Sequence, residues 1–453
     1  MNPDLAAYDL HVPRPRPLTS LLALGLAIGM ACAGLVAACS SDPEPLALVR
    51  VPGDAETVTQ AVARVSPGGT VLVGAGVYPE QVLVDKTDVT IRGEDRNATI
   101  IDGEGRRPYG IVAISDGVRI ENLTVRAATF YGVLVTGLHD ENGPSAHNGD
   151  GYDTLDPEQF PPVQRFSVDH VTAHNNGLYG IYAFDANNGV IRDSYASGSA
   201  DSGFYVGQCE DCNILVTGNV AERNAVGFEN ANASGPLTIA GNRFSGNRVG
   251  MTLISNYREA FTPQRANTVV GNLVVDNVEP DSPAQATGGF GIGIGISGAR
   301  ENVLARNTVT GNPVAGVLLA NTEDLAAVDN SFVDTGWAGN GIDLANVSAS
   351  RAPASGNCVS TTNAAATPVT LLPAALTDPC PDGEQPAATA TDLPPVEVPR
   401  GVSFLKVAAP APQPDLGPWT GQAEPLPATV ALPDPDTFDL PGPDFLAELT
   451  GTA

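Results

Sequence analysis

The segment from residue 137 to 165 holds the densest group of side chains that could do chemistry. It contains two histidines and four aspartates, namely His139, Asp140, His147, Asp150, Asp153 and Asp156. Asp150, Asp153 and Asp156 offer the hard oxygen ligands that Ca²⁺ prefers, although their spacing is not that of an EF-hand. The segment therefore predicts a Ca²⁺ site at these three residues. The alternative is that the acids only keep a surface loop solvated.

Two reactions fit these acids. In a lyase, bound Ca²⁺ would acidify the C5 proton of a sugar, and His147 or Arg258 would be the base that removes it. A hydrolase needs two carboxylates at a fixed separation, which Asp153 and Glu229 could supply. His147, Asp153 and Arg258 are therefore the candidate catalytic residues.

A repeat from about residue 118 to 347 must position these groups. Each copy has an apolar residue, a polar pair, an Asn or small residue, a turn and then Gly-apolar-x-apolar, with a period of about 23 to 25 residues. A second Asn follows the first in Asn219/Asn224, Asn242/Asn247, Asn272/Asn277 and Asn307/Asn312. Each copy has short strands and no helical pattern, so it can bury its apolar face only by stacking on its neighbours. The sequence thus predicts an all-β chain folded as a right-handed, single-stranded parallel β-helix.

In such stacked coils, asparagines in register can form amide ladders at the turns. The repeat aligns Asn219 with Asn272, Asn307 and Asn330, and we expect these four to share one ladder. A leucine-rich solenoid is the rival fold, but its Leu/Asn consensus is missing.

The strand after each repeat glycine should alternate between the core and the outer surface. The inward residues would be Val133, Ile181, Phe204, Phe228, Met251, Val317 and Ile342. The outward residues would be Leu134, Tyr182, Tyr205, Glu229, Thr252, Leu318 and Asp343. Tyr182, Tyr205 and Glu229 would form a row across consecutive coils, suited to stacking on sugar rings and binding their hydroxyls. The alternative is that stacked tyrosines merely stabilise an exposed sheet.

Three insertions are expected to leave the coils at one edge of this row. They are residues 137–165, residues 256–266 and the Cys209–Cys212 corner between them. Long loops on a rigid scaffold concentrate function, so these insertions would form a wall beside the row.

The charge of the chain restricts its partners. The formal net charge is −28, which repels phosphate backbones and excludes nucleic acid as a natural partner. The charge fits solubility outside the cell, or alternatively the binding of a cation or a basic ligand. We expect a monomer.

The N-terminus has the pattern of an export signal. Arg14 and Arg16 precede an apolar run from Leu18 to Ala38, which ends in small residues before Cys39. This resembles the bacterial lipobox and implies a signal peptide over residues 1–38, lipid attachment at Cys39 and anchoring to the outer face of the cell membrane. An uncleaved membrane anchor is the alternative, because about 20 apolar residues can also span a bilayer.

The remaining cysteines fit an oxidising compartment. Cys358 with Cys380 would close a C-terminal loop, and Cys209 with Cys212 would form a local disulfide at a coil corner. No second CxxC and no nearby histidine pair supports a zinc site.

The domain boundaries follow from these patterns. We expect a linker at 39–50 and a β-helix at 51–385, divided into a capped opening at 51–117, repeat coils at 118–347 and a disulfide-closed segment at 348–385. A Pro/Ala-rich, disordered tail would follow at 386–453.

Two stretches carry a resemblance to known families. Gly76-Val77-Tyr78-Pro79-Glu80 and Val89-Thr90-Ile91-Arg92-Gly93 resemble the first coils of pectinesterases and other pectate-lyase-like proteins. Gly203-Phe204-Tyr205-Val206-Gly207-Gln208-Cys209 resembles exported β-helix repeat proteins of actinobacteria, a family of unassigned activity. The resemblance implies a fold and export, but it does not imply a reaction. The catalytic motifs of polygalacturonases, pectinesterases and mannuronan epimerases are absent from the sequence.

These observations lead to one functional hypothesis and two alternatives. The hypothesis is a cell-surface lipoprotein that binds or processes a polysaccharide; as an enzyme it would be a lyase, a glycoside hydrolase or a C5-epimerase. The alternatives are a non-catalytic structural or protein-interaction protein of the envelope, and a periplasmic accessory protein similar to NosD. The NosD-like alternative would need soft Met, Cys and His metal ligands, and these are scarce in the chain.

Overall fold

The computed structural model describes residues 45–140, 143–144, 156–285, 288–360, 370–372, 393 and 395–451. The chain divides into two units, Met1–Pro43 and Glu44–Ala453, and all described residues belong to the second. The expected signal segment and Cys39 therefore lie outside the described residues. Among the described residues, no helix is long and apolar enough to cross a membrane.

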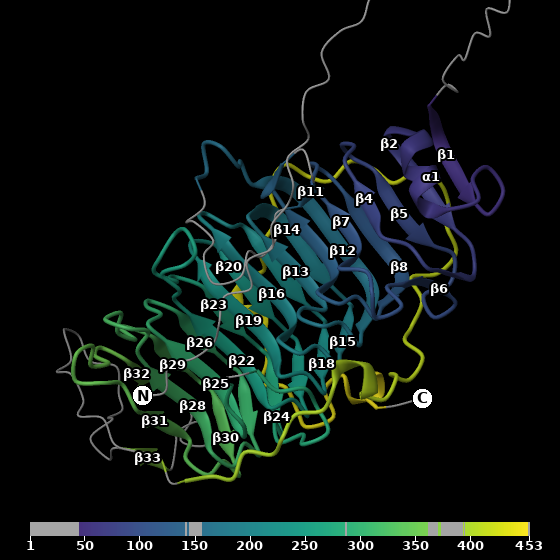
Figure 1. Ribbon diagram of the computed structural model, residues 1–453. Coiled ribbons are helices and arrows are strands. Elements are labelled where there is room, and N and C mark those ends of the chain that lie inside the picture. Colours follow the sequence, from purple (N-terminus) through teal and green to yellow (C-terminus); the bar gives the residue numbers. More distant parts are fainter. Residues whose placement is uncertain are drawn as a thin grey trace, which may run out of the picture. The chain divides into compact units, whose positions relative to one another are not determined.

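The second unit is a parallel β-helix whose coils contribute to three ladders of strands, here called faces 1, 2 and 3 (Figure 1). Face 1 runs through β1 (Leu46–Val51), β2 (Val65–Val73), β5 (Thr90–Gly93), β8 (Arg119–Arg126), β12 (Val163–His174), β14 (Ala186–Arg192), β17 (Ile214–Thr217), β20 (Leu237–Ala240), β23 (Thr268–Val270), β26 (Val303–Ala305), β29 (Ser331–Val333) and β32 (Cys358–Ser360).

Face 2 shares the long strands β8 and β12 with face 1. Its other strands are β3 (Gly76–Tyr78), β6 (Thr99–Asp102), β15 (Tyr195–Ser197), β18 (Val220–Glu222), β21 (Arg243–Ser245), β24 (Leu273–Val275), β27 (Thr308–Thr310) and β30 (Gly336–Ala338).

Face 3 forms a separate sheet. It runs through β4 (Val82–Val84), β7 (Tyr109–Ala113), β9 (Tyr131–Thr136), β13 (Ile181–Phe184), β16 (Ser202–Cys209), β19 (Val226–Ala233), β22 (Val249–Ile254), β25 (Ile292–Ser297), β28 (Ala315–Ala320), β31 (Leu344–Asn346) and β33 (Leu371–Leu372). A small antiparallel pair, β10 (His139–Asp140) and β11 (Gly143–Pro144), follows β9.

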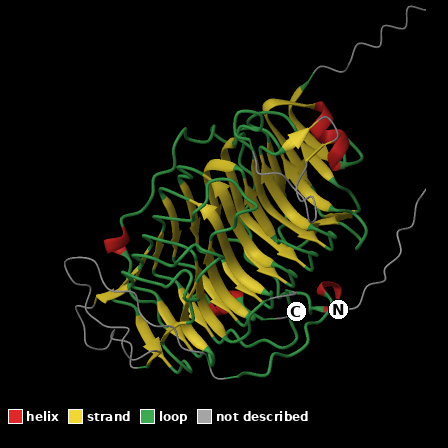
Figure 2. Cartoon of the chain, turned by 60° about the vertical axis from the view of Figure 1, so that its left-hand side comes forward, coloured by secondary structure: helices red, strands yellow, loops and turns green. Residues whose placement is uncertain are grey.

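Helix α1 (Val58–Arg64) packs on the first coils (Figure 2). Thr57 caps its N-terminus by accepting a hydrogen bond from the backbone N–H of Gln60. Val58, Ala61 and Val62 are buried, so the helix covers the open end of the apolar column, as the sequence predicts.

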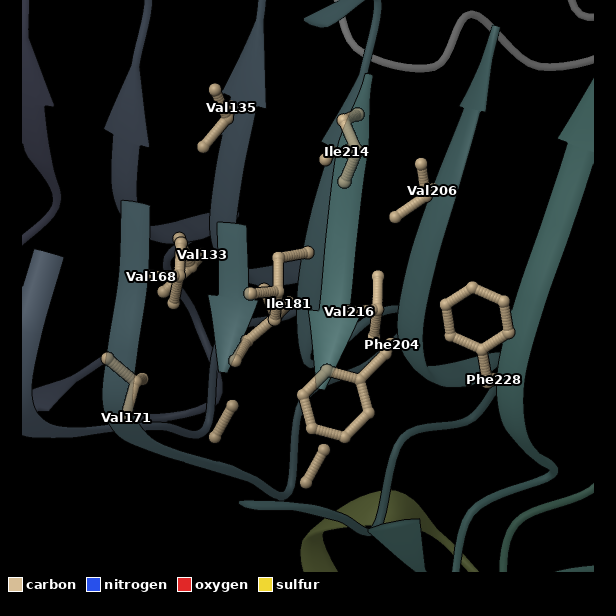
Figure 3. Packing of buried hydrophobic residues seen from close by; sticks show 14 of the residues in the cluster. Val133, Val135, Val168, Val171, Ile181, Phe204, Val206, Ile214, Val216 and Phe228 are labelled. Carbon is tan, nitrogen blue, oxygen red and sulfur yellow. The ribbon is translucent and has the colours of Figure 1, made fainter. Parts of the chain in front are cut away.

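The core confirms the predicted inward register over most of the repeats. Val133, Ile181, Phe204 and Phe228 pair in register on face 3 and pack against strands of face 1 in the interior (Figure 3). The prediction is wrong at the last copy, because Val317 pairs with Leu344 rather than with Ile342. Asp343 consequently does not continue the outward row.

Three asparagine ladders hold the turns. The first contains Asn219, Asn242, Asn272 and Asn307, the second Asn224, Asn247, Asn277, Asn312 and Asn340, and the third Asn267, Asn302, Asn330 and Asn357. The predicted ladder is confirmed, but Asn330 belongs to the third ladder and not to that of Asn307. In the first two ladders each inner amide bonds the next rung and a strand carbonyl, which satisfies buried polar groups that water cannot reach.

Residues 395–451 differ from the expected disordered tail. They have little regular structure beyond the 3-10 turns η3 (Phe404–Lys406), η4 (Pro435–Thr437) and η5 (Ala447–Leu449), yet they hydrogen-bond along the β-helix. Arg96 and Arg248, each almost fully buried, donate to the carbonyls of Pro414 and Pro399. The segment is therefore held by charged donors of the coils, which a composition-based prediction of disorder does not consider.

Replacing a central rung of a ladder should destabilise the fold strongly. Asn242 is fully buried; it accepts from Asn219 and donates to Val216 and Asn272. We expect Asn242→Ala to lower the free energy of unfolding by about 2 to 4 kcal/mol, because several buried groups lose their partners. Denaturant unfolding would measure this. Asn357→Ala, at the half-buried last rung, is the control and should cost less; equal losses would contradict the role of the inner rungs.

Candidate active site

A group of tyrosines lies on the outer surface of face 3, opposite the core. The rings of Tyr109, Tyr131 and Tyr179 stack from coil to coil, with centroids 5.6 Å apart at each step. Tyr182 lies 4.4 Å from Tyr179 and 4.6 Å from Tyr205. With neighbouring apolar residues they form a hydrophobic cluster separate from the main core, here called the tyrosine cluster.

The predicted row is in register but is not exposed. Tyr182 pairs with Tyr205, and Tyr205 with Glu229, as the repeat predicts. Their exposed fractions are only 4%, 1% and 9%, so the expectation of an open row is wrong. The reason is that segments from both edges of face 3 reach the row.

Contacts from residues 255–267 and 276–291 account for this cover. The Tyr205 hydroxyl donates to both carboxyl oxygens of Glu259, at 3.0 and 3.1 Å, and the Ala260 N–H donates to Gln208. From the other segment, the Gln285 amide donates to Asp201. The second segment connects β24 to β25 and was not among the insertions expected from the sequence.

Three carboxyl groups gather at the end of the tyrosine cluster. Asp201 and Glu229 are hydrogen-bonded to each other. The Ser202 hydroxyl lies between them, 2.7 Å from Glu229 Oε2 and 3.3 Å from Asp201 Oδ1. Glu259, bonded to Tyr205, is the third. Asp201, Glu229 and Glu259 are called the acid cluster below.

Burial keeps protons on this cluster near neutral pH. Loss of solvent raises the pKa of Glu229 well above its ordinary value, and the negative charge of Asp201 raises it further. Burial likewise raises the pKa of Asp201, and that of Glu259 to about 7. Two hydrogen-bonded carboxyls lose their protons as a pair, so one proton is retained after the first leaves. The cluster can therefore both donate and accept a proton.

Asp201 is the member of the pair that reaches solvent. It is half-buried, whereas Glu229 behind it is buried. Asp201 lies next to Leu178, because its backbone N–H donates to the Leu178 carbonyl. Leu178 is half-buried and packs against the tyrosine cluster. Phe130 on the same cluster is 44% exposed. An apolar rim thus leads from Phe130 to the Asp201 carboxyl.

Two buried polar groups at the C-terminal edge of face 3 lack partners. Both carboxyl oxygens of Asp185 are without a hydrogen bond, and so is Nε2 of Gln208 in the next coil. Neither residue is more than 1% exposed. Burial alone raises the pKa of Asp185 to about 7. The backbone carbonyl of Asp185 accepts from the N–H groups of Gly137 and Val163, at 3.0 and 3.1 Å.

Of the other predicted site residues, the structure describes Asp156 and Arg258, and neither makes a hydrogen bond or an ion pair with the acid cluster. His147, Asp150 and Asp153 lie outside the described residues. Asp156 is exposed and accepts a bond from the Glu158 N–H, which caps a local turn. Arg258 is exposed, one residue before Glu259, and its backbone N–H bonds Asn256.

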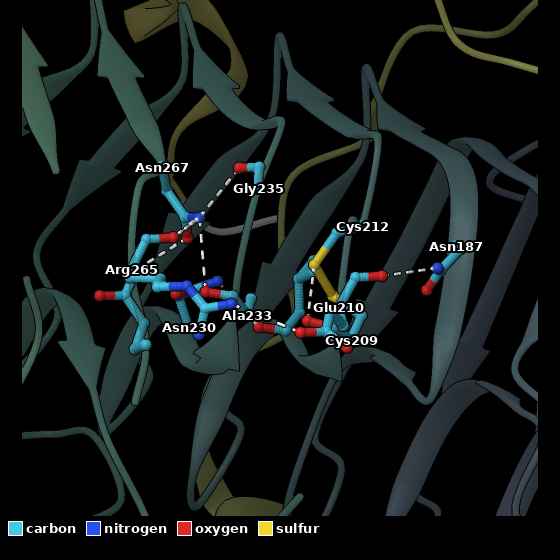
Figure 4. The surroundings of a disulfide bond; sticks show 11 residues. Asn187, Cys209, Glu210, Cys212, Asn230, Ala233, Gly235, Arg265 and Asn267 are labelled. Atoms are coloured by element: carbon cyan, nitrogen blue, oxygen red, sulfur yellow. Dashed lines mark hydrogen bonds and ion pairs between the residues drawn. A yellow bond between two sulfur atoms is a disulfide. The ribbon is translucent and has the colours of Figure 1, made fainter. Parts of the chain in front are cut away.

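The predicted corner disulfide is present. Cys209 and Cys212 are bonded, with Cα atoms 5.2 Å apart, at the turn between β16 and β17 (Figure 4). Cys358 is not free, and its expected partner Cys380 lies outside the described residues.

A second group of titratable residues lies at the turn between faces 1 and 2. Potential ligand atoms of Asp169, His170 and Asp193 lie within 4.8 Å of one another. Asp169 already bonds His170 Nδ1 at 2.6 Å and pairs with Arg192. A guanidinium thus occupies the side of the carboxylate that a cation would need, and the group is an ion-pair network.

Sequence reasoning missed Asp201, Glu259 and Gln285 as partners of Glu229. They come from a turn before β16 and from two non-repeating insertions, so no periodicity relates them. The available signal was that Asp201 immediately precedes β16 and that Glu229 lies within β19 of the adjacent coil.

The raised pKa values predict that stability falls as the pH rises from 5 to 8. Asp185 and Glu259 have folded pKa values of about 7, above their unfolded values, so the fold favours their protonated forms. The resulting stabilisation is complete below the unfolded pKa and is lost as the pH rises to the folded pKa of about 7, by about 2 to 3 kcal/mol for each group between pH 5 and 8.

In the double variant Asp185→Asn/Glu259→Gln, stability should fall less between pH 5 and 8 than in the parent chain. Thermal unfolding of the variant and the parent chain across the pH range measures the difference. Glu301→Gln, at an exposed turn, is the control, and its stability should depend on pH in the same way as that of the parent chain. An equal fall in the double variant would show that other groups cause it.

The comparisons agree with the fold. The family model of the right-handed beta helix region matches residues 89–274. The comparison with curated proteins finds no match. Among solved structures, the A-module of mannuronan C-5 epimerase AlgE4 from Azotobacter vinelandii is similar, with 15% identity, a TM-score of 0.36, and coverage of 65% of this chain and 91% of that one.

Two further structures show the same likeness. Pectate lyase Pel9A has 16% identity and a TM-score of 0.41, with 84% of this chain and 95% of that one covered. The PL6 family alginate lyase AlyGC has 10% identity and a TM-score of 0.38, with 70% and 58% covered. At these identities and TM-scores the likeness concerns the fold alone. The parallel strand ladders and the family-model match show that the chain is a right-handed parallel β-helix.

Proposed function

We propose that the protein acts on a polysaccharide by general acid-base chemistry at Asp201 and Glu229. The observation that supports this most is that these two carboxyls, one half-buried and one buried, bond each other instead of a cation. On faces 1 and 2, by contrast, buried or half-buried acids of the strands have arginine partners: Glu121 has Arg92, Asp102 has Arg126, Asp169 has Arg192 and Glu222 has Arg223. An unneutralised pair costs stability, and such pairs are typical of sites that handle protons.

The two carboxyls have different tasks in this proposal. Asp201 is partly exposed and is the group that would touch the substrate and transfer the proton. Glu229 is a positioning residue: Ser202 holds it, and its carboxyl group hydrogen-bonds Asp201, whose pKa is raised by burial. Gln285 donates to Asp201 from the other side and orients its carboxyl group.

A polysaccharide fits the surface that leads to Asp201. Phe130, Tyr109 and Leu178 are exposed or half-buried, and they extend across several coils on the outside of face 3. Aromatic faces stack on the C–H patches of sugar rings, and a row of them suits a chain of sugars more than a single small molecule.

We further propose that the protein works outside the cell. The apolar run before Cys39 supports export and lipid attachment, and the Cys209–Cys212 disulfide is of a type that persists in oxidising compartments. In the same proposal, Asp150, Asp153 and Asp156 bind Ca²⁺.

One observation favours a non-catalytic envelope protein as the second candidate. Tyr182, Tyr205 and Glu229 are almost completely covered. Such a cluster could serve only to attach residues 255–267 and 276–291 to the β-helix, with Asp201 and Glu229 protonated as neutral hydrogen-bonding groups.

Glu229→Gln and Asp201→Asn distinguish the two candidates. Both amides keep the side-chain shape and remove the acid. We expect the melting temperature of each variant to stay constant or rise, because a buried pair of like groups is relieved, while cleavage of the polysaccharide falls at least 100-fold.

The measurement is the release of new reducing ends or unsaturated products from a panel of bacterial and plant polysaccharides. Glu301→Gln is the control and should retain full activity. If the parent chain alters no polysaccharide and Glu229→Gln is strongly destabilised, the acid cluster is structural and the proposed activity is wrong.

A further inference from the structure

Residues 395–451, here called the C-terminal segment, contact the connection between β24 and β25. The backbone N–H of Val402 donates to the carbonyl of Ser282, at 3.0 Å. Gly401 lies so close to this connection that a Cβ atom on it would stand 2.5 Å from the backbone nitrogen of Ala284. Ser282 is fully buried, although it lies outside the repeat. The C-terminal segment therefore packs directly on the connection.

Arg248 joins the same two parts of the chain from the side of the β-helix. Its guanidinium group donates to the Pro399 carbonyl and, at 3.5 Å, to the Ser282 carbonyl. It also lies 5.0 Å from the centre of the Phe290 ring, near the end of the connection. Arg248 is almost fully buried, so it needs these acceptors, because an unsatisfied buried cation is costly. Arg248 thus fixes the C-terminal segment and the connection to each other.

The connection carries Gln285 to the acid pair. Gln285 follows the stretch that the C-terminal segment contacts, and its amide donates to the Asp201 carboxyl. Burial raises the pKa of Asp201, and this bond lowers it, because the amide N–H stabilises the ionised carboxylate. The other groups that hydrogen-bond Asp201 are Glu229, Ser202 and Tyr179, which belong to the repeat coils. Among these partners, Gln285 alone comes from an insertion.

We propose that Arg248 and residues 399–402 are positioning residues for the acid pair and act through Gln285. This proposal rests on the proposed function and adds to it how the carboxyl that touches the substrate is held. The described residues of the connection contain no strand, so the ladder of face 3 does not fix Gln285. Arg248 and residues 399–402, together called the clamp, supply that constraint. A shift of about 1 Å in such a support is enough to disturb a catalytic geometry.

Two glycines of the C-terminal segment provide a matched pair of variants. Gly401→Ala places a methyl group against Ala284 and should displace the C-terminal segment from the connection. Gly442→Ala is the control, because a Cβ atom there meets no other atom within 4 Å. Both glycines are exposed and neither has a positive φ, so alanine strains the backbone at neither position.

The first readout is turnover of the polysaccharide by the full chain across a range of pH. We expect Gly401→Ala to lower kcat about fivefold with little change in KM, because the clamp does not touch the substrate. The pH profile should move to higher pH, because weaker donation from Gln285 raises the pKa of Asp201. A merely structural role would lower kcat without moving the profile. Gly442→Ala should match the parent chain.

A double-mutant cycle tests the route. Gln285→Ala should lower kcat about tenfold and move the pH profile in the same direction, because it removes the donor itself. Adding Gly401→Ala should then have no further effect, since the group through which the clamp acts is gone.

Hydrogen exchange gives a readout that does not need activity. Backbone amides of the connection should exchange faster in Gly401→Ala than in Gly442→Ala, while those of β22 keep the rates of the parent chain. Arg248→Met should also speed exchange in the connection. Arg248→Lys retains a charged donor and should have a smaller effect.

The outcomes separate this proposal from the function on which it rests. If Gly401→Ala keeps the kcat and the pH profile of the parent chain, whatever its exchange rates, the positioning role is wrong and the acid-base site stands. Losses of kcat that add fully in Gly401→Ala/Gln285→Ala lead to the same conclusion. If the parent chain alters no polysaccharide, or if Asp201→Asn keeps full turnover, the proposed function and the positioning role are both wrong.

Discussion

The stacking of coils in fixed register is the constraint on which the rest of this structure depends. Backbone hydrogen bonds join each strand to the next coil, but they would tolerate a slip along the strand. Ladders of buried asparagines remove that freedom, because each amide must meet both the next rung and a strand carbonyl. Register then decides which side chains become neighbours across coils that are far apart in sequence. Tyr205 and Glu229 adjoin for this reason alone.

Acidic side chains of the β-helix have two kinds of partner, arginines on faces 1 and 2 and another carboxyl group on face 3. On faces 1 and 2, Glu121 and Asp169 have arginine partners in adjacent coils. On face 3, Glu229 meets Asp201 instead. A fold that needed only stability could have placed an arginine or an apolar residue there, since an unpaired buried acid lowers the free energy of unfolding. The difference between the faces therefore argues that the acid pair is retained for its chemistry.

The sequence was sufficient for the parts of the structure that repeat. Apolar spacing predicted the inward residues from Val133 to Met251, and the paired asparagines predicted ladders at the turns. It failed where the repeat is interrupted, as at the last copy, where Leu344 rather than Ile342 enters the core. It also failed for the exposure of Tyr205, because Glu259 arrives from an insertion whose path no period encodes. Residues 395–451 show the same limit, since their partners lie hundreds of positions away.

The segments that cover the tyrosine cluster, residues 255–267 and 276–291, limit the directions from which a substrate could reach the acid cluster. Glu229 lies behind Asp201, and Tyr205 lies beneath Glu259, so neither can be approached directly from outside. Asp201 is different, because it lies at the edge of the cover next to Leu178 and retains contact with solvent. In a site of this form the half-buried Asp201 lies in front, and the buried Glu229 behind it is shielded from water. Shielding maintains the raised pKa of the pair, since water reaching Glu229 would stabilise its ionised form. The burial that contradicted the expectation of an open row is thus the property that lets the acid pair hold a proton near neutral pH.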